Sequence, residues 1–311
     1  DILVATPQRL IDIHRQGGVN LRSVKTMVLD EADRVMDMGF IPQISKILEL
    51  VPHKKRQNFL FSATMPDKVL KLSEQFLDFP KLVEVSPQAT TASTIDQVFY
   101  KVPNFRTKLN LLENLLKDEE KLEKVLIFTR TKGSANEIFR LLSSRWKDNI
   151  RVIHGNKDQN ARINAIEAFA KGEIRILVAT DVAARGLDVE MVSHVVNFDV
   201  PRLYEDYVHR IGRTGRAERE GIAITFANKV EEHHLKQIEK LIQMLIPEKS
   251  LFEAQVKIIE TPFSEMQEIA KELDTIKKKL DPTFKGAFHD KKNRKKPLQK
   301  KRYIKRKNNR I

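Results

Sequence analysis

The chain has 311 residues, of which 41% are hydrophobic, and its formal net charge is +14. This length is sufficient for two domains of ordinary size with sizeable cores. The sequence has no run of 18 or more apolar residues, which excludes a transmembrane helix. It also has no cysteine, which excludes disulfides and thiolate-bound zinc, and we expect a cytoplasmic protein without membrane contacts.

Most of the positive charge lies at the C-terminal end. Residues 285–311 contain 13 Lys or Arg and one acid, Asp290, so this segment carries +12 and residues 1–284 carry only +2. A segment of this composition cannot bury enough apolar surface to fold alone, and such segments often bind polyanions. We therefore predict a disordered basic tail over residues 285–311.

Short apolar runs alternate with amphipathic stretches along most of the chain. In the first part they predict strands over residues 2–6, 26–30, 58–63 and 81–85. Since Asp1 leads directly into such a run, we expect an N-terminally incomplete chain, and the lack of a signal peptide then indicates nothing about export. The polar stretch 86–94 interrupts the pattern, as a linker would.

A second series of alternating elements follows this stretch. Strands are predicted over residues 97–102, 124–129, 150–155, 174–180, 193–199 and 221–227, with helices such as 134–146 and 160–173 between them. Strands that alternate with helices predict parallel sheets covered on both faces, so two such series predict two α/β domains. We place the first domain at 1–86, the linker at 87–96, the second domain at 97–246 and a C-terminal extension at 247–284.

The extension has a different pattern. Residues 251–260 are predicted to be extended, and residues 264–280 form a polar helix pattern. Ser264 and Gln267 have the spacing of a capping box, which predicts Ser264 as the N-cap of this helix.

An acidic cluster, Asp30-Glu31-Ala32-Asp33, follows the apolar run 26–29. Ligands of open parallel sheets bind beyond the carboxyl ends of the strands, where an acid can hold Mg²⁺ on a nucleotide and a neighbouring Glu can activate water. An equally weighted interpretation is that Asp30 caps the following helix and that the other acids favour its N-terminal dipole.

Two further strand ends carry polar residues. Ser62 and Thr64 follow the run 58–61, where hydroxyl groups can hydrogen-bond the acidic cluster, although such residues are usually turn formers. The run 174–179 leads into another group that can contact a ribose or a nucleic-acid phosphate. An ordinary strand-to-helix turn explains Asp181 alone but explains the whole group poorly. Its members are Thr180, Asp181, Arg185, Gly186 and Asp188.

The stretch 207–220 is the strongest local signal for phosphate binding. His209, Arg210, Arg213 and Arg216 surround Gly212 and Gly215. Arginine is suited to bidentate phosphate contact, and glycine lets the backbone approach a ligand closely. A solvated basic helix would not explain two glycines, which weaken helices.

These residues together resemble the DEAD-box RNA helicases of superfamily 2, over most of residues 1–246. The resemblance is carried by TPQR (6–9), DEAD (30–33), SAT (62–64), IFTRT (127–131), QNAR (159–162), ATDVAARGLD (179–188) and HRIGRTGR (209–216). Gln8 replaces the glycine that the family usually has in the first of these motifs. The surrounding VMDMGF and NFDVP are similar to the bacterial RhlE-like branch. The resemblance implies two RecA-like parallel-sheet domains, the first incomplete, with ATP and Mg²⁺ as cofactors and RNA as partner.

The resemblance also implies a role for each matching residue. Asp30 would hold Mg²⁺ through water, Glu31 would be the general base, and Asp188 and Gly186 would bind the nucleotide. Arg213 and Arg216 would reach the γ-phosphate, with Arg216 as an arginine finger supplied in cis. The residues that would couple nucleotide state to domain closure are Asp33, Ser62, Thr64 and His209. The residues that would line the RNA path are Thr6, Pro7, Arg9, Gln159, Arg162, Thr180 and Gly186.

The chain departs from the family in one feature. It contains no G-x-x-x-x-G-K-[ST] phosphate loop, and RTKGSA (130–135) is only a reversed echo of one. We therefore expect a fragment of an ATP-dependent RNA helicase or ribonucleoprotein remodeller that is not itself an active ATPase. RNA contacts would be largely independent of sequence, with single strands or short duplexes. Non-catalytic RNA binding is the main alternative, and a DNA-directed helicase is a third.

Overall fold

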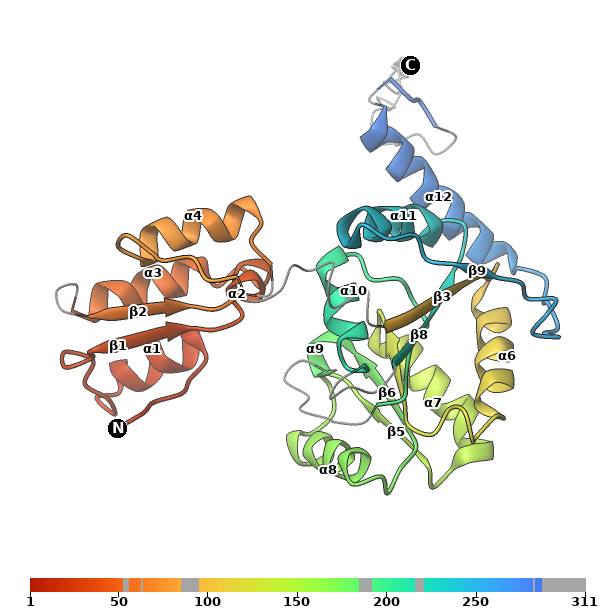
Figure 1. The fold of residues 1–311 in the computed structure, drawn as a ribbon, viewed down its shortest axis with the longest axis horizontal. Coiled ribbons are helices and arrows are strands. Elements are labelled where there is room, and N and C mark those ends of the chain that lie inside the picture. Colours follow the sequence, from red (N-terminus) through yellow and green to blue (C-terminus); the bar gives the residue numbers. More distant parts are fainter. Residues whose placement is uncertain are drawn as a thin grey trace, which may run out of the picture.

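The computed structural model describes residues 1–52, 56–62, 64–84, 95–184, 192–215, 221–281 and 283–286. Figure 1 shows two bodies, which we call the N-terminal unit (described residues within 1–84) and the C-terminal unit (described residues within 95–286). One contains a two-stranded sheet and the other a seven-stranded sheet, and every strand pair is parallel. This is the α/β architecture of two parallel sheets that the sequence predicts.

The N-terminal unit is built around β1 (Thr26–Leu29) and β2 (Gln57–Leu60). Its helices are α1 (Pro7–Arg15), α2 (Ala32–Asp37), α3 (Ile41–Leu50) and α4 (Asp67–Phe76). In α4, Val69, Leu72 and Phe76 are buried at the spacing of one helix face, and they pack with Leu29 and Ile44. This apolar contact holds α4 against the strand whose end carries the acidic cluster.

Two predicted strands, 2–6 and 81–85, are absent from the described residues of the N-terminal unit, where residue 85 is not described. Residues 2–6 have no regular structure before α1, and Ile2 and Val4 are 95% and 91% exposed. Residues 81–84 are likewise irregular. An apolar run becomes a strand only when a neighbouring strand accepts and donates its hydrogen bonds, and the described part of this unit pairs β1 and β2 only with each other.

The seven-stranded sheet has the order β5-β6-β4-β7-β8-β3-β9. Its strands are β3 (Ile95–Lys101), β4 (Val125–Thr129), β5 (Ile150–Ile153), β6 (Ile176–Thr180), β7 (His194–Asn197), β8 (Gly221–Ala227) and β9 (Glu248–Lys249). All residues of β4, β6 and β7 are buried, as expected for parallel strands covered on both faces. In the register of β4 and β6, Thr129 lies opposite Thr180, so the carboxyl ends of these strands meet at one edge.

Helices cover this sheet. They are α6 (Phe105–Leu116), α7 (Lys132–Trp146), α8 (Gln159–Ala170), α9 (Asp181–Ala184), α10 (Tyr204–Ile211), α11 (Glu231–Ile242) and α12 (Phe263–Leu280). Asn104, Thr131 and Asp158 cap α6, α7 and α8 by accepting a backbone N–H in the first turn. None of the described helices has the length and apolar character needed to cross a membrane.

The chain after Ile246 continues the C-terminal unit. β9 pairs with β3, and residues 250–262, which we call the strap, run along α6 before α12 begins. Leu251, Ala254 and Val256 of the strap pack against the main core cluster. The prediction of an extended segment over 251–260 is wrong for residues 251–255, which form turns, and residues 256–260 belong to no strand.

The helix after the strap begins two residues earlier than the capping box predicts. Pro262 is the N-cap residue of α12, without a side-chain cap hydrogen bond, so the prediction of Ser264 as N-cap is wrong. Proline pre-organises a helix start through its fixed φ.

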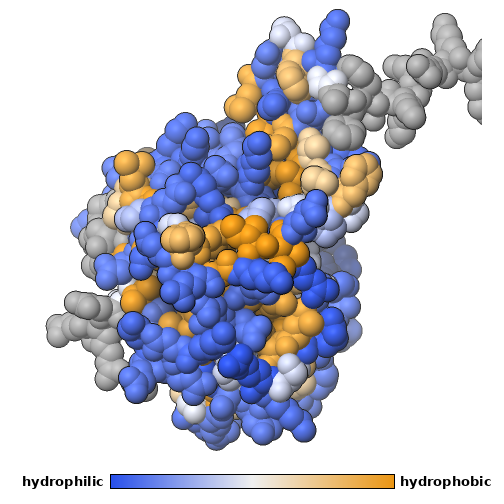
Figure 2. Space-filling model, turned by 90° about the vertical axis from the view of Figure 1, so that its right-hand side faces the viewer, coloured by the Kyte–Doolittle hydropathy of each residue, from blue (hydrophilic) through white to orange (hydrophobic). Residues whose placement is uncertain are grey.

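Figure 2 shows the side of the molecule that lies at the right of Figure 1, where apolar side chains gather in a band across a mostly hydrophilic face. Phe252, Ile258 and Phe263 of this segment remain exposed.

Candidate functional site

The acidic cluster lies where β1 ends and α2 begins. Asp30 is exposed, and its Oδ1 accepts the backbone N–H of Glu31 at 2.8 Å. The donors further into the helix start are satisfied elsewhere: Asp33 N–H donates to Ser62 Oγ at 3.2 Å, and Arg34 N–H donates to Asp33 Oδ1 at 3.0 Å. Asp30 therefore does not cap α2 in the way the simpler interpretation of the cluster required, and its carboxylate remains at the surface.

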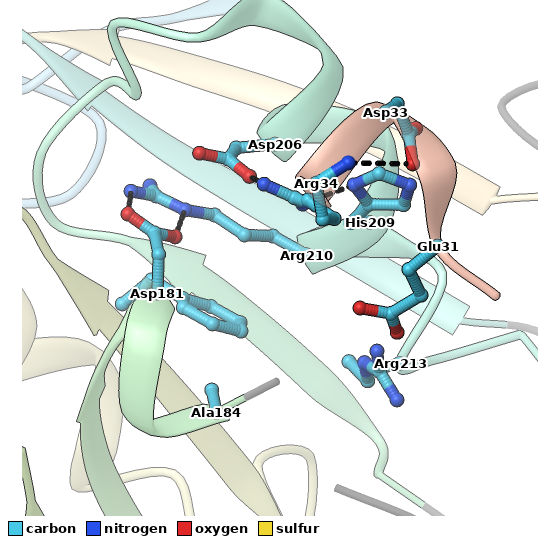
Figure 3. A pocket seen from close by; sticks show the side chains of 10 residues that line it. Glu31, Asp33, Arg34, Asp181, Ala184, Asp206, His209, Arg210 and Arg213 are labelled. Carbon is cyan, nitrogen blue, oxygen red and sulfur yellow. Dashed lines mark hydrogen bonds and ion pairs between the residues drawn. The ribbon is translucent and has the colours of Figure 1, made fainter. Parts of the chain in front are cut away.

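Glu31 has an unusual backbone. Its φ and ψ of 49° and 50° place it in the left-handed region, which costs a residue other than glycine on the order of 1–3 kcal/mol. The next residue is held firmly, because Ala32 is fully buried and its N–H donates to the carbonyl of Phe61 at 3.0 Å. The surrounding fold thus maintains a strained position, from which the Glu31 side chain points into the open part of the site in Figure 3.

Asp33, Ser62 and Thr64 form the hydrogen-bonded group that the motifs predict. Thr64 Oγ1 donates to Asp33 Oδ2 at 3.0 Å, and Ser62 Oγ donates to the carbonyl of Thr64 at 2.6 Å. Asp33 and Thr64 are both buried. The group exists because β1 and β2 are adjacent parallel strands, so the turns that follow them meet at one edge.

A second group connects the N-terminal unit to α10 of the C-terminal unit. Arg34 Nη1 pairs with Asp206 Oδ1, and Arg34 Nη2 contacts Nδ1 of His209. The side chains of Arg34 and Asp206 are only 8% and 7% exposed. Figure 3 shows α2 and α10 bringing these three side chains together. His209 is thus the fourth predicted coupling residue, and it reaches the acidic cluster through Arg34.

Burial lowers the pKa of His209, and the Arg34 guanidinium lowers it further. The carboxylates of Asp33 and Asp206 oppose this shift, and Arg213 adds to it. The net effect favours the neutral imidazole, which can accept a hydrogen bond from an arginine at Nδ1.

Arg210 has a structural role. Its guanidinium is 1% exposed and forms a two-point ion pair with Asp181, at 2.6 and 2.9 Å. It also donates to the side chain of Asn197 and to the carbonyl of Asp199, and it lies over the ring of Phe128. The expectation that Arg210 contacts phosphate is therefore wrong, because its donors are used to hold α10 to the edge of the sheet.

These groups surround a pocket of about 140 Å³. It is lined by Glu31, Asp33, Arg34, Phe128, Asp181, Ala184, Asp206, His209, Arg210 and Arg213. Figure 3 shows the Glu31 carboxylate and the Arg213 guanidinium pointing toward one another from the two units. A predicted base and a predicted phosphate-binding arginine thus face the same space.

Three predicted nucleotide-site residues, Gly186, Asp188 and Arg216, lie outside the described residues. Of the predicted RNA-path residues, Thr6, Pro7 and Arg9 lie at the start of α1. Gln159 and Arg162 lie on the first turn of α8, where Arg162 Nη1 donates to Gln159 Oε1 at 3.0 Å. Thr180 ends β6 and is only 8% exposed, so in this arrangement its side chain offers little surface to RNA.

The predicted magnesium residue fits only one mode of metal binding. The described part of the chain contains no group of three or more His, Cys, Asp or Glu that could hold a metal ion by itself. Mg²⁺ usually keeps several waters and binds through one or two carboxylates together with substrate phosphates. The exposed carboxylate of Asp30 suits this water-mediated mode, in which the nucleotide supplies the remaining ligands.

The sequence did not indicate a functional role for Arg34 or Asp206, and it left the role of Asp181 open. Arg34 directly follows the acidic cluster, and Asp206 lies three residues before His209. Each position is next to a recognisable motif, but neither alone indicates an ion pair between residues so far apart in the chain.

Comparisons with known proteins point to one family. A helicase conserved C-terminal domain model matches residues 107–218, and a DEAD/DEAH box helicase model matches residues 1–72. The chain is 43% identical to the ATP-dependent RNA helicase RhlB of Pseudomonas syringae, over 77% of this chain and 60% of that protein. It is 44% identical to the ATP-dependent RNA helicase CshA of Listeria monocytogenes, over 77% of this chain and 45% of that protein.

Among solved structures, S. cerevisiae Dbp5 bound to RNA and ADP BeF3 is similar with a TM-score of 0.73 and 29% identity. The match covers 87% of this chain and 68% of that one. The fold is therefore that of two RecA-like units with parallel sheets, as in Dbp5. The chain belongs to the DEAD-box family of ATP-dependent RNA helicases. It spans about 60% of the length of RhlB, and the RhlE-like branch stays a prediction.

Proposed function

We propose that the protein containing this chain uses ATP to separate short RNA duplexes or to remodel ribonucleoproteins. Binding of ATP and RNA closes the two units over each other, and hydrolysis followed by product release reopens them. The observation that carries the proposal is the contact of Arg34 with Asp206 and His209, which joins the units so that Glu31 faces Arg213. The relatives named RNA helicases and the RNA-bound Dbp5 support it.

The residues at the pocket have different roles in the proposed phosphoryl transfer. Bound ATP with Mg²⁺ supplies the phosphate that is cleaved and the charge that polarises it. Asp30 would hold the metal through water, Glu31 would accept a proton from the attacking water, and Arg213 would stabilise the negative charge on the phosphate. Asp188 and Gly186 contact the nucleotide, and Arg216 acts as the arginine finger.

The RNA path uses residues of both units. Thr6, Pro7 and Arg9 at the start of α1 contact one stretch of backbone, and Gln159 and Arg162 on α8 contact another. Helix starts and basic side chains bind phosphate without reading bases, so binding is largely independent of sequence. Thr180, which is buried at the end of β6, joins the path only if the turn after it shifts.

The 311-residue chain by itself is not expected to hydrolyse ATP at a useful rate. Its sequence contains no phosphate loop, whose lysine and backbone N–H groups hold the β- and γ-phosphates. Without this loop, Glu31 and Arg213 have no correctly held substrate.

Two measurements test the proposal. Fluorescence anisotropy with a single-stranded oligo(U) should show RNA binding by the 311-residue chain, whereas RNA-stimulated phosphate release should be at background and equal in Glu31→Gln. Phosphate release that Glu31→Gln abolishes would overturn the expectation of inactivity. Absence of RNA binding would contradict the proposed function itself.

A further inference from the structure

The Arg34–Asp206 ion pair is a contact between units that none of the recognised motifs includes. Arg34 lies on α2, beside the acidic cluster, and Asp206 lies in the first turn of α10. Both side chains are more than nine-tenths buried where the helices meet. His209, one helical turn after Asp206, contacts the same guanidinium.

The burial of this pair depends on the arrangement of the two units. A buried charge loses its hydration and is tolerated when an opposite charge and hydrogen bonds replace the water. Asp206 and Arg34 supply the opposite charge for each other only when α2 and α10 are in contact. An ion pair with this burial adds little to stability by itself, but it favours one relative placement over others that would leave a buried charge unpaired.

Both partners connect directly to groups that face the pocket. The backbone N–H of Arg34 donates to Asp33, which accepts from Thr64, so the pair is continuous with the hydrogen-bonded group at the ends of β1 and β2. On the other side, α10 ends at Ile211, and Arg213 N–H donates to the carbonyl of Arg210 at 3.2 Å. The position of α10 therefore sets the position of Arg213 relative to Glu31.

We propose that Arg34 and Asp206 are positioning residues, whose ion pair holds the two units in the arrangement that places Arg213 opposite Glu31. The purpose of this arrangement rests on the proposed function. The pair's effect on the placement of the units is measurable without ATP turnover, so failure of one proposal is distinguishable from failure of the other.

The test uses the full 311-residue chain and the distance between its units. Since the chain has no cysteine, Lys46→Cys on α3 and Lys147→Cys after α7 provide two unique, exposed sites for a fluorescent donor and acceptor. Energy transfer is measured with saturating oligo(U) and Mg-ATP present, because these ligands are proposed to close the units. The labelled parent is compared with Arg34→Gln, with Asp206→Asn and with both substitutions together. Arg22→Gln and Asp96→Asn are matched controls, because they make the same charge changes at exposed positions in the same two units.

Each single variant should lower the ratio of close to separated molecules by at least about fivefold, the lower range of typical coupling effects. The double variant should be no worse than the worse single variant, because removing both charges leaves none unpaired. Arg34→Lys keeps the charge and should recover part of the loss. The controls should match the parent.

Two results would overturn the proposal. One is an unchanged ratio in Arg34→Gln and Asp206→Asn, including the case in which the parent itself is mostly separated. The other is additive loss in the double variant, which would mean that each substitution disturbs its own helix independently. Circular dichroism of each variant shows whether the helices are retained. Where one variant is partly unfolded, the comparison of the double variant with the two single variants still decides the question.

Discussion

Arg210 and Arg213 lie three positions apart in the same motif but have different surroundings. Arg210 is buried against Asp181, Asn197 and Phe128, whereas Arg213 lines the open part of the pocket. The motif predicts phosphate contact for each of its arginines, because every arginine side chain is suited to phosphate. Only the surroundings separate an arginine that holds the fold together from one that faces the site.

Replacing these two arginines should therefore have different effects on stability. Arg210→Met removes one partner of a buried ion pair and should lower the free energy of unfolding of the C-terminal unit by about 3–5 kcal/mol. Arg213→Gln should change it by less than about 1 kcal/mol. Urea unfolding followed by fluorescence of Trp146, which lies in the core of this unit, measures both. Equal losses would contradict the assignment of Arg210 as structural.

His209 makes the contact between the units dependent on pH. Its pKa is below the ordinary value of about 6.5 while it is buried beside Arg34. A histidine that regains its ordinary pKa on separation binds protons more readily in the separated state. The contact is therefore fully present above about pH 6.5 and weakens as the pH falls below this value.

Acidification from pH 7.5 to 5.5 should thus reduce energy transfer between labels at positions 46 and 147. His209→Gln cannot gain a proton, so most of this pH dependence should disappear. A fluorescence titration of the two labelled chains provides the measurement. A pH response that is the same in His209→Gln would assign the effect to other groups.

At the scale of elements, α6 holds the strap through a row of side-chain amides. Asn104, Asn110 and Asn114 donate to the backbone carbonyls of Ile259, Lys257 and Ala254, at 2.7, 3.0 and 2.9 Å. The three asparagines lie on one face of the helix or at its cap. Backbone carbonyls need hydrogen-bond partners, and this row of amides provides them for a segment that pairs with no strand.

Loss of these amides should release the strap. Asn114→Ala removes one hydrogen bond, worth about 1 kcal/mol, and Asn104→Ala removes the cap of α6 as well, so its cost should be larger. Amide hydrogen exchange across residues 254–261 should accelerate in both variants. Asn160→Ala, at an exposed position of α8, is the control and should leave exchange there unchanged. Unchanged exchange in Asn104→Ala would mean that apolar packing alone holds the strap.

At the scale of the whole molecule, charge is divided between a nearly neutral body and a strongly basic end. Residues 1–284 carry +2 and residues 285–311 carry +12. Residues 287–311 lie outside the described part of the chain, so their predicted disorder is untested. Their composition nevertheless predicts a large electrostatic contribution to binding of RNA, because each basic residue that contacts phosphate releases a counterion.

Removal of the tail should weaken RNA binding and reduce its salt dependence. If half of the basic residues contact phosphate, the slope of log affinity against log salt for residues 1–311 should be roughly −4 to −6. The slope for residues 1–284 should be much closer to zero. Anisotropy titrations with oligo(U) at several salt concentrations compare the two chains. Equal affinities and slopes would show that the tail does not contribute.

Local sequence determined most of the secondary structure. The runs that became β1 and β2 and those of β3 to β8 were recognisable, because strands of a covered parallel sheet are continuously apolar. The same pattern failed for residues 2–6 and 81–84, because a strand also needs a hydrogen-bonding neighbour. The motifs likewise indicated the family and brought Asp33, Ser62 and Thr64 into one predicted site, since adjacent parallel strands end at one edge.

Tertiary structure alone decided how the polar residues of the site are paired. Arg34 meets Asp206 and His209, and Arg210 meets Asp181, although the residues next to each arginine do not specify these partners. Local propensity cannot specify such partners, because 175 residues separate Arg34 from His209. Pairing of buried charges is set by which helices approach each other, and that depends on packing of the entire sheet and of the two units.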